Sequence, residues 1–189
     1  MLLNYNIISK DCTLFNKVKQ IYEASFPIDE RRNELNFEHI ASHEAKFNIL
    51  GIDRGNDLIG FINYWKFDTF VYIEHFAIDA NKRGDGVGSE SLRYFLDKMD
   101  CPVIIEVEPP VSSLTKRRVA FYERMGFKMW NSINYMQPPY DNTRNSIELK
   151  LMTLHFNSQQ DVLQAAQAIG HDVYTKHYNS SMKENQNPT

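Results

Sequence analysis

The chain has 189 residues, of which 42% are hydrophobic and 24% are charged, and its formal net charge is −3. This balance predicts one folded domain of ordinary size, and the slight acidity gives no reason to expect a nucleic-acid partner. The only two cysteines, Cys12 and Cys101, do not make a disulfide framework or a metal site. We therefore expect no metal. Because no run approaches the roughly 18 apolar residues of a membrane span, we also expect a cytoplasmic protein with no membrane partner.

The first elements are a predicted strand over residues 3–9 and a helix over 13–26, in which apolar residues recur at helical spacing. A charged loop, "FPIDERRNE", leads to a second, short helix over 35–44. Two β-like runs follow at 46–54 and 58–67, and the "GND" between them predicts a hairpin.

The next predicted strand reads "FVYIEHFAI" and ends at Ile78. The alternation of side chains along a strand places Tyr72, Glu74 and Phe76 on the same face as Ile78. His75 then points to the opposite face, where we expect it to be packed or hydrogen-bonded rather than catalytic.

The second half alternates helices with strands. In chain order, its periodicity predicts a helix over 88–99, a strand over 102–110, a helix over 113–125, strands over 127–136 and 145–154, and a helix over 158–174. This order predicts a mixed α/β (α+β) fold with a largely antiparallel central sheet flanked by helices. We expect one domain over 1–155, a C-terminal helix within 156–178 that packs on the core or on a partner, and a disordered tail over 179–189.

Residues 83–88 read "RGDGVG", between an apolar strand and a helix. Glycines allow a ligand to approach the backbone, and the N–H groups that open a helix favour an anion such as a phosphate. A Walker loop is excluded because no lysine follows the last glycine. The dinucleotide fingerprint has Ser89 at its third glycine position, so it is the weaker alternative. The pattern R-x-x-G-x-G is matched by Arg83, Gly86 and Gly88.

This pattern, together with "HFAI" before it and "RRVAFYERMGF" after it, resembles the GNAT family of N-acetyltransferases. The resemblance covers roughly residues 2–155, and the predicted order of elements is similar to the fold of that family. The sequence departs from the family at Thr115, where many members carry an asparagine near the start of the later helix.

The resemblance implies an enzyme that moves an acetyl group from acetyl-CoA to a primary amine of a small molecule or peptide by direct transfer. It also implies a pyrophosphate held by the glycine loop, a pantetheine arm held by the preceding strand, and the possibility of a homodimer. Two alternatives stay open: a non-catalytic acyl-CoA-binding or regulatory module, and a dinucleotide-binding protein. The residues that we expect to contact acetyl-CoA are Phe76, Ala77, Ile78, Lys82, Arg83, Gly84, Asp85, Gly86, Val87, Gly88 and Ser89.

Transfer to an amine needs a base for the ammonium and an acid for the leaving thiolate. Tyr122 matches the tyrosine that family members often use as the acid and is our candidate for that role; the alternative is a packed aromatic beside Phe121. Carboxylates among apolar residues are candidates for a raised pKa. We therefore favour Glu74 as the base, followed by Glu108, which shares a strand face with Glu106.

The resemblance assigns acceptor specificity to the first helical region and the last hairpin. Glu30, Tyr135 and Tyr140 lie in these regions and are the candidates for attracting or enclosing the amine. A solvated loop and a packed tyrosine explain the same residues without a substrate.

Overall fold

The computed structural model describes residues 2–178 of the chain and has a mixed α/β fold. Its eight-stranded sheet runs in the order β1-β2-β3-β4-β5-β8-β6, and β7 pairs with β8. The pairing of β4 with β5 is parallel, and the other pairings between these strands are antiparallel. The strands are β1 (Leu3–Ile7), β2 (Phe47–Arg54), β3 (Asp57–Lys66), β4 (Val71–Ile78), β5 (Val103–Val107), β6 (Lys128–Met129), β7 (Tyr135–Gln137) and β8 (Ile147–Leu154).

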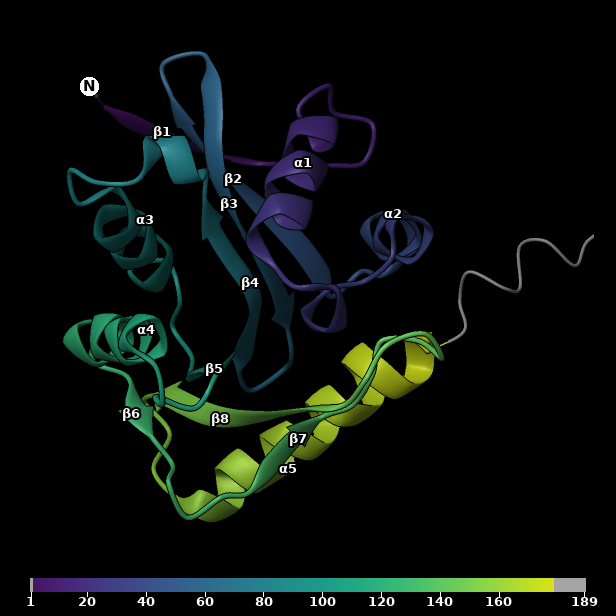
Figure 1. Cartoon of the computed structure of the whole chain (residues 1–189), viewed down its shortest axis with the longest axis vertical. Coiled ribbons are helices and arrows are strands. Elements are labelled where there is room, and N and C mark those ends of the chain that lie inside the picture. The colour runs from purple at the N-terminus through teal and green to yellow at the C-terminus, as the bar shows by residue number, and fades with distance from the viewer. Residues whose placement is uncertain (1, 179–189) are drawn as a thin grey trace, which may run out of the picture.

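Helices cover both faces of the sheet (Figure 1). On one face lie α1 (Phe15–Ser25) and α2 (Glu34–His43), which pack against β2, β3 and β4. On the other face lie α3 (Val87–Leu96) and α4 (Ser113–Arg124), against β4 and β5. Each face has its own cluster of buried hydrophobic side chains, so the sheet divides the core into two layers. Within residues 2–178, every helix is too short or too polar to traverse a lipid bilayer.

Two predicted elements differ in the structure. The strand expected over 127–136 is two short strands, β6 and β7, because residues 130–134 form a turn in which Ile133 N–H bonds to the Trp130 carbonyl. The helix expected over 158–174 is regular only over α5 (Gln159–Ile169), which the Ser158 side chain caps. A π-helical turn, η3 (Gly170–Tyr174), and a 3₁₀ turn, η4 (Thr175–His177), continue it.

The segment Gln159–His177, which we call the C-terminal segment, packs on the layer of α1 and α2. Its apolar residues Val162, Ile169 and Val173 are fully buried in that cluster. Lys46 and Glu44, just before β2, form ion pairs with Asp172 and Lys176 of the segment. The predicted disordered tail, 179–189, lies outside the described residues.

A β-bulge at Glu74 interrupts the alternation along β4. In the pairing with β3, Asn63 faces His75 and Tyr64 faces Ile73, so Glu74 is an extra residue without a partner. A bulge turns the residues beyond it to the opposite face. Glu74 lies with Tyr72 on the face of α1 and α2, as predicted, but Phe76 and Ile78 lie on the opposite face, so that part of the prediction is wrong. His75, predicted on the opposite face, lies on the same face as Glu74, with which it contacts Tyr140.

The strands β4 and β5 separate at the same level. Their parallel pairing covers only Val71, Tyr72 and Ile73 of β4, which face Val103, Ile104 and Ile105 of β5. Beyond Ile73, β4 is paired only on its β3 side. The sheet therefore opens at this point, and the opening determines where a ligand can enter.

Candidate active site

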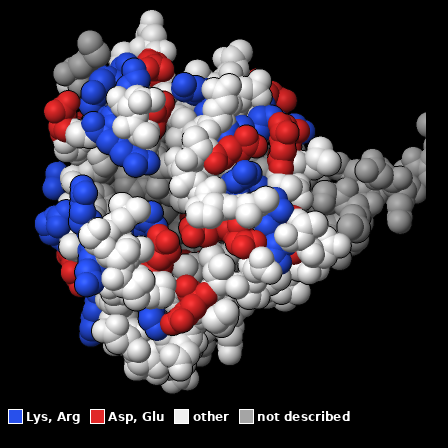
Figure 2. All heavy atoms as spheres, viewed as in Figure 1, with Lys and Arg blue, Asp and Glu red and all other residues white. Residues whose placement is uncertain are grey.

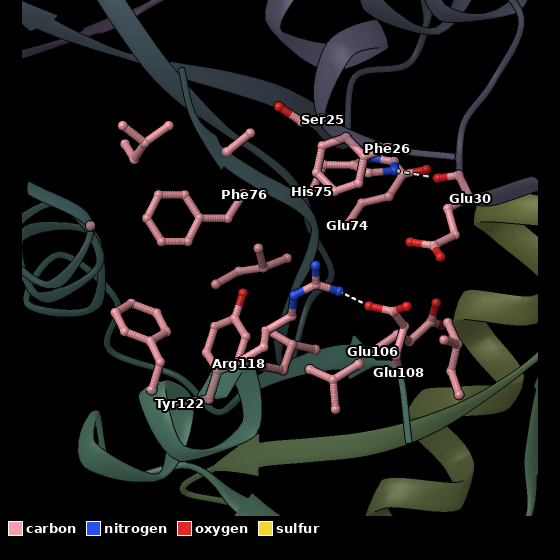
Figure 3. A pocket seen from close by; sticks show the side chains of 18 of the residues that line it. Ser25, Phe26, Glu30, Glu74, His75, Phe76, Glu106, Glu108, Arg118 and Tyr122 are labelled. Carbon is pink, nitrogen blue, oxygen red and sulfur yellow. Dashed lines mark hydrogen bonds and ion pairs between the residues drawn. The ribbon is translucent and has the colours of Figure 1, made fainter. Parts of the chain in front are cut away.

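A cavity of about 570 Å³ occupies the opening between β4 and β5. Its walls come from the second half of β4, the end of β5, the end of α1, the glycine loop and the inner side of α4. Figure 3 shows the side chains that converge on it, with Phe76 and Tyr122 at one end and the carboxylates of Glu30, Glu106 and Glu108 at the other. We call this space the central cavity.

The glycine loop forms one end of the central cavity and has an unusual backbone. Gly84, Asp85 and Gly86 have φ values of 106°, 50° and 74°. A Cβ atom added at Gly84 or Gly86 would meet no atom within 4 Å, so these glycines are required by backbone conformation and leave open space in front of the loop. Gly86 is the N-cap of α3, and no side chain caps this helix. The free N–H groups at its start are therefore available to an anion.

The basic residues beside the loop differ in their surroundings. Arg83 lines the central cavity, and its Nε donates a hydrogen bond to the carbonyl of Ile78 at 3.0 Å. Lys82 instead lies outside the cavity and pairs with Asp57 at 2.9 Å. Further exposed basic residues line α4, and Figure 2 shows Lys and Arg gathered on the side of the molecule that carries α3 and α4. This side favours an anionic ligand such as a phosphate group.

The other residues predicted around the loop divide between cavity and core. Phe76, Ala77 and Ile78 all line the central cavity, at the stretch of β4 that has no partner on the β5 side. Val87 is 2% exposed and packs into the core, so only its backbone can contact a ligand. Ser89 lies in the first turn of α3, and the structure does not place it on the cavity wall.

Tyr122 is brought into the central cavity by α4. Its ring packs edge-on against Phe127 and Phe121 while its hydroxyl points into the cavity (Figure 3). Burial raises the pKa of this phenol to about 12, so it keeps its proton at neutral pH. A protonated hydroxyl directed at the cavity can donate a proton to a ligand there, and the acid role of Tyr122 stays a prediction.

Glu74 lines the central cavity, but its carboxylate forms a buried ion pair with Arg32. The two side chains are 3.0 Å apart and each is 1% exposed. Trp65 Nε1 donates to the same carboxylate at 2.7 Å, and the Tyr140 hydroxyl does so at 3.0 Å. Burial alone would raise the pKa of Glu74, but the charge of Arg32 and these donors lower it below its usual value. The predicted raised pKa is therefore wrong, and Glu74 is a weak base.

Glu106 has the properties that were expected of Glu74. It comes from β5, is half-buried and lines the central cavity. The hydroxyl of Tyr174 donates to its Oε2 at 2.7 Å, and the hydroxyl of Tyr135 donates to Oε1. Burial raises the pKa of Glu106 to about 7, although these phenol donors oppose the rise. A carboxylate that titrates near neutral pH can both accept and release a proton.

Glu108 and Glu30 lie on facing walls at the same end of the cavity. Glu108 follows the end of β5 and forms an ion pair with Arg118, which reaches toward it from α4 (Figure 3). This pair makes Glu108 less available as the predicted base. Glu30 comes from the turn after α1, and its pKa is raised by burial and by the negative charge of Glu108. Both carboxylates give this end of the cavity a preference for a cation.

The remaining candidates lie just behind these carboxylates. Tyr140 is 2% exposed, contributes to the cavity wall, and donates to Glu74, so its hydroxyl is already engaged. Tyr135 is not among the residues that line the cavity, because its hydroxyl is turned toward Glu106. His75 is buried, which lowers its pKa, and its Nε2 donates to the carbonyl of Glu30 at 2.8 Å. It is a neutral, hydrogen-bonded histidine, as expected.

Sequence reasoning missed three residues of this site. Arg32 lies in the charged run "DERRNE", where nothing distinguishes it from a solvated arginine, yet it is 1% exposed. Tyr72 and Tyr174 are fully buried near Glu106, and their hydroxyls lie 3.0 Å apart.

Thr115, where the sequence departs from the family pattern, forms a capping box with Ser112 at the start of α4. Within residues 2–178, no group of three or more His, Cys, Asp or Glu side chains is arranged to hold a metal ion.

Comparison with known proteins identifies relatives of this chain in sequence and in fold. YjbC of Bacillus subtilis (strain 168), whose name describes an acetyltransferase, is 26% identical over 153 residues, which are 79% of this chain and 77% of YjbC. A solved structure of a GNAT-family protein from Bacteroides thetaiotaomicron is 30% identical, has a TM-score of 0.85, and covers 90% of this chain and 98% of its own. A GNAT structure from Elizabethkingia anophelis with acetyl-CoA bound is 14% identical and shares the fold, with a TM-score of 0.57 over 82% of this chain and 98% of its own.

The sequence also matches the family described as "Acetyltransferase (GNAT) family" over residues 14–127, a range that runs from just before α1 to just after α4. This range contains the glycine loop, both strands that border the opening, and Tyr122. Because the match spans more than half of the chain, this protein belongs to the acetyltransferase (GNAT) family.

Proposed function

We propose that this protein transfers the acetyl group of acetyl-CoA directly to a primary amine of a small molecule or peptide. The observation that carries the proposal is the central cavity, which has an anion-binding loop at one end, carboxylates at the other, and a protonated phenol directed into it. Coenzyme binding has support from the acetyl-CoA bound in the related fold from Elizabethkingia anophelis.

The pyrophosphate of acetyl-CoA would bind at the start of α3. The positive φ values of Gly84 and Gly86 and the uncapped N–H groups fit an anion there, and Arg83 adds a positive charge. The pantetheine arm would then follow β4, where Phe76, Ala77 and Ile78 lack a β5 partner and their backbone groups can bond to its amides. The thioester would lie near the bulge, between Tyr122 and the carboxylates.

The chemical step needs two proton transfers by residues of this chain. The acceptor arrives as an ammonium, and Glu106 removes a proton to give the neutral amine. The amine nitrogen attacks the thioester carbon, the C–N bond forms, and the tetrahedral intermediate collapses with loss of the C–S bond. Tyr122 donates its proton to the departing thiolate and is reprotonated by the second proton of the amine nitrogen, which the amide product loses. The proton taken by Glu106 returns to solvent. Glu30 and Glu108 attract the cationic acceptor to this end of the cavity.

The first experiment is a calorimetric titration of the protein with acetyl-CoA, with NAD as the comparison ligand. We expect binding of acetyl-CoA and none of NAD. Gly86→Glu should abolish acetyl-CoA binding, because the positive φ is strained for glutamate and its carboxylate repels the pyrophosphate. Gln160→Glu on the exposed start of α5 adds the same charge far from the loop and should leave binding unchanged.

Transfer is then measured as acetyl-CoA-dependent release of free thiol with benzylamine, 1,4-diaminobutane and alaninamide as acceptors. Thiol release with at least one amine, and its loss in Glu106→Gln, is the expected result. Binding of acetyl-CoA without thiol release from any of these amines would favour a non-catalytic acyl-CoA-binding module. Binding of NAD in place of acetyl-CoA would contradict the proposal as a whole.

A further inference from the structure

Glu106 is surrounded by phenols rather than by charged partners. Tyr174 donates to Oε2 at 2.7 Å, and Tyr135 donates to Oε1. Because the single hydroxyl hydrogen of Tyr174 is used on Glu106, Tyr72 must be the donor in the 3.0 Å contact between the two tyrosines. A chain of hydrogen bonds therefore runs from Tyr72 through Tyr174 to the carboxylate.

Tyr174 comes from a part of the chain that lies beyond the family match, which ends at residue 127. It belongs to the π-helical turn η3, where Val173 and Tyr174 both point inward although they are adjacent. A widened turn of this kind changes the direction of successive side chains, and such turns are common at functional sites. The result is a tyrosine that is 1% exposed and reaches the cavity wall from behind.

Several contacts fix the position of η3. Arg32 Nη2 donates to the Val173 carbonyl at 2.9 Å and also pairs with Glu74. Asn36 donates to the carbonyl of His177 at 2.9 Å. The ring of Tyr174 also packs against Tyr140, with ring centroids 5.0 Å apart. The C-terminal segment is therefore attached to the residues that form the acceptor end of the cavity.

We propose that Tyr174 is a positioning residue for Glu106, so that the C-terminal segment completes the acceptor end of the active site. This inference rests on the proposed function, in which Glu106 is the base. The hydroxyls of Tyr174 and Tyr135 hold the carboxylate in place and favour its ionised form, which is the form that accepts a proton from the acceptor.

The groups that face Glu106 have opposite effects on the ionisation of its carboxyl. Burial and the negative charge of Glu74 on β4 oppose ionisation, while the hydrogen bonds from Tyr135 on β7 and Tyr174 on η3, and the nearby hydroxyl of Tyr72 on β4, favour it. Glu106 in turn disfavours ionisation of the Tyr140 phenol, so this neighbour also stays neutral. Without Tyr174, the balance moves toward the protonated carboxyl, and less of the base is ready at neutral pH.

The direct test is an NMR titration of the full-length protein with ¹³C-labelled glutamate carboxyls, in which Glu106→Gln identifies the Glu106 signal. We expect a pKa of about 7 for the wild type. Tyr174→Phe should raise it by roughly half a unit to one unit, because a donor to the charged form is lost. Tyr135→Phe should shift it in the same direction. The control Tyr178→Phe, just beyond the C-terminal segment, should leave it unchanged.

The kinetic test uses the fastest of the three amines named above. In Tyr174→Phe, the acidic limb of the profile of kcat/KM against pH should move upward with the NMR titration, while acetyl-CoA affinity and thermal stability stay close to wild type. In a Glu106→Gln background, Tyr174→Phe should have no further effect on kcat/KM.

The outcomes distinguish failure of the role of Tyr174 from failure of the proposed acetyl transfer. An unchanged Glu106 titration in both phenylalanine variants, or an equal loss of activity from Tyr174→Phe with and without Glu106, would overturn the role of Tyr174. Full activity of Glu106→Gln would instead overturn Glu106 as the base. If no amine releases thiol, the proposed function fails, and the NMR titration still decides whether Tyr174 controls the ionisation of Glu106.

Discussion

Glu74 and Glu106 carry the same functional group on neighbouring strands, but their partners differ in charge. Glu74 accepts from the guanidinium of Arg32, which favours the ionised form and lowers its pKa. Glu106 accepts only from neutral phenols in the contacts that the structure describes, so burial dominates and its pKa rises to about 7. The partner therefore decides which carboxylate is structural and which is available for proton transfer.

Replacing Glu74 with Gln should destabilise the protein severely. The change leaves the charge of Arg32 buried without its counter-ion, a defect that costs about 3–5 kcal/mol. Urea unfolding measures the loss. Glu23→Gln, which removes a partially exposed partner of Arg31 at 4.0 Å, is the matched control and should change stability by less than about 0.5 kcal/mol. Equal stabilities for the two variants would contradict the structural role of Glu74.

Replacing Tyr122 with Phe removes the proposed acid and keeps the packing of its ring. We expect kcat to fall by about 10²-fold or more, with little change in the affinity for acetyl-CoA. Steady-state kinetics and calorimetry measure the two quantities. Tyr64→Phe is the control, because Tyr64 lies in the same hydrophobic layer and is not among the residues that line the cavity. Unchanged turnover in Tyr122→Phe would mean that another group or water protonates the thiolate.

At the scale of single elements, β4 is the strand on which the site depends. The bulge at Glu74 directs two consecutive side chains, Glu74 and His75, to the layer of α1 and α2. Beyond the bulge, Phe76 returns to the α4 side, where its ring lies 6.3 Å from Phe121. One inserted residue thus separates the structural ion pair from the stretch of strand that lines the central cavity, where we propose that acetyl-CoA binds.

Close approach of β3 to β4 beside this stretch requires Gly60. A Cβ at this position would lie 2.5 Å from the carbonyl oxygen of Ala77 and 2.6 Å from a side-chain carbon of Ile78. Gly60→Ala should therefore force the strands apart and cost about 1–3 kcal/mol in unfolding free energy. Gly170→Ala is the control, since its Cβ meets open space in a helical conformation. A stable Gly60→Ala variant with normal acetyl-CoA affinity would contradict this packing.

Most elements and the glycine loop were predictable from the sequence, because the residue patterns that indicate them lie within short segments. Helical spacing indicated α1, α3 and α4, and the loop needs glycine at Gly84 and Gly86 because both have positive φ. The bulge was not predictable, since "VYIEHFAI" alternates normally and the extra residue appears only in the pairing with β3. The partners of Glu106 were also hidden, because Tyr174 lies 68 residues away in sequence.

At the scale of the whole molecule, the raised pKa of Glu106 lowers the free energy of unfolding at neutral pH. The pKa of Glu106 is about 7 in the fold and 4.5 as its ordinary value, so the folded protein holds an extra proton between these limits. The resulting stabilisation is complete below about pH 4.5, disappears as the pH rises through 7, and changes no further above that. Glutamine at this position has no such dependence.

The free energy of unfolding of the wild type and of Glu106→Gln should therefore diverge with pH. From pH 5 to pH 8 we expect the wild type to lose roughly 1–3 kcal/mol relative to the variant. Contributions from Glu74, whose lowered pKa acts in the opposite direction, are common to both proteins and cancel. Urea denaturation at the two pH values makes the comparison. Parallel pH dependences would show that Glu106 titrates normally.

The contact between Arg32 and Val173 joins residues 141 positions apart in the chain. During synthesis on a ribosome, Arg32 and Glu74 are therefore made long before the carbonyl that completes the arginine's set of acceptors. The glycine loop and α3 need only nearby strands, so the coenzyme end can assemble while translation continues. The acceptor end has to wait for the C-terminal segment, so in a nascent chain the proposed acetyl-CoA-binding end should form before the proposed acceptor end is complete.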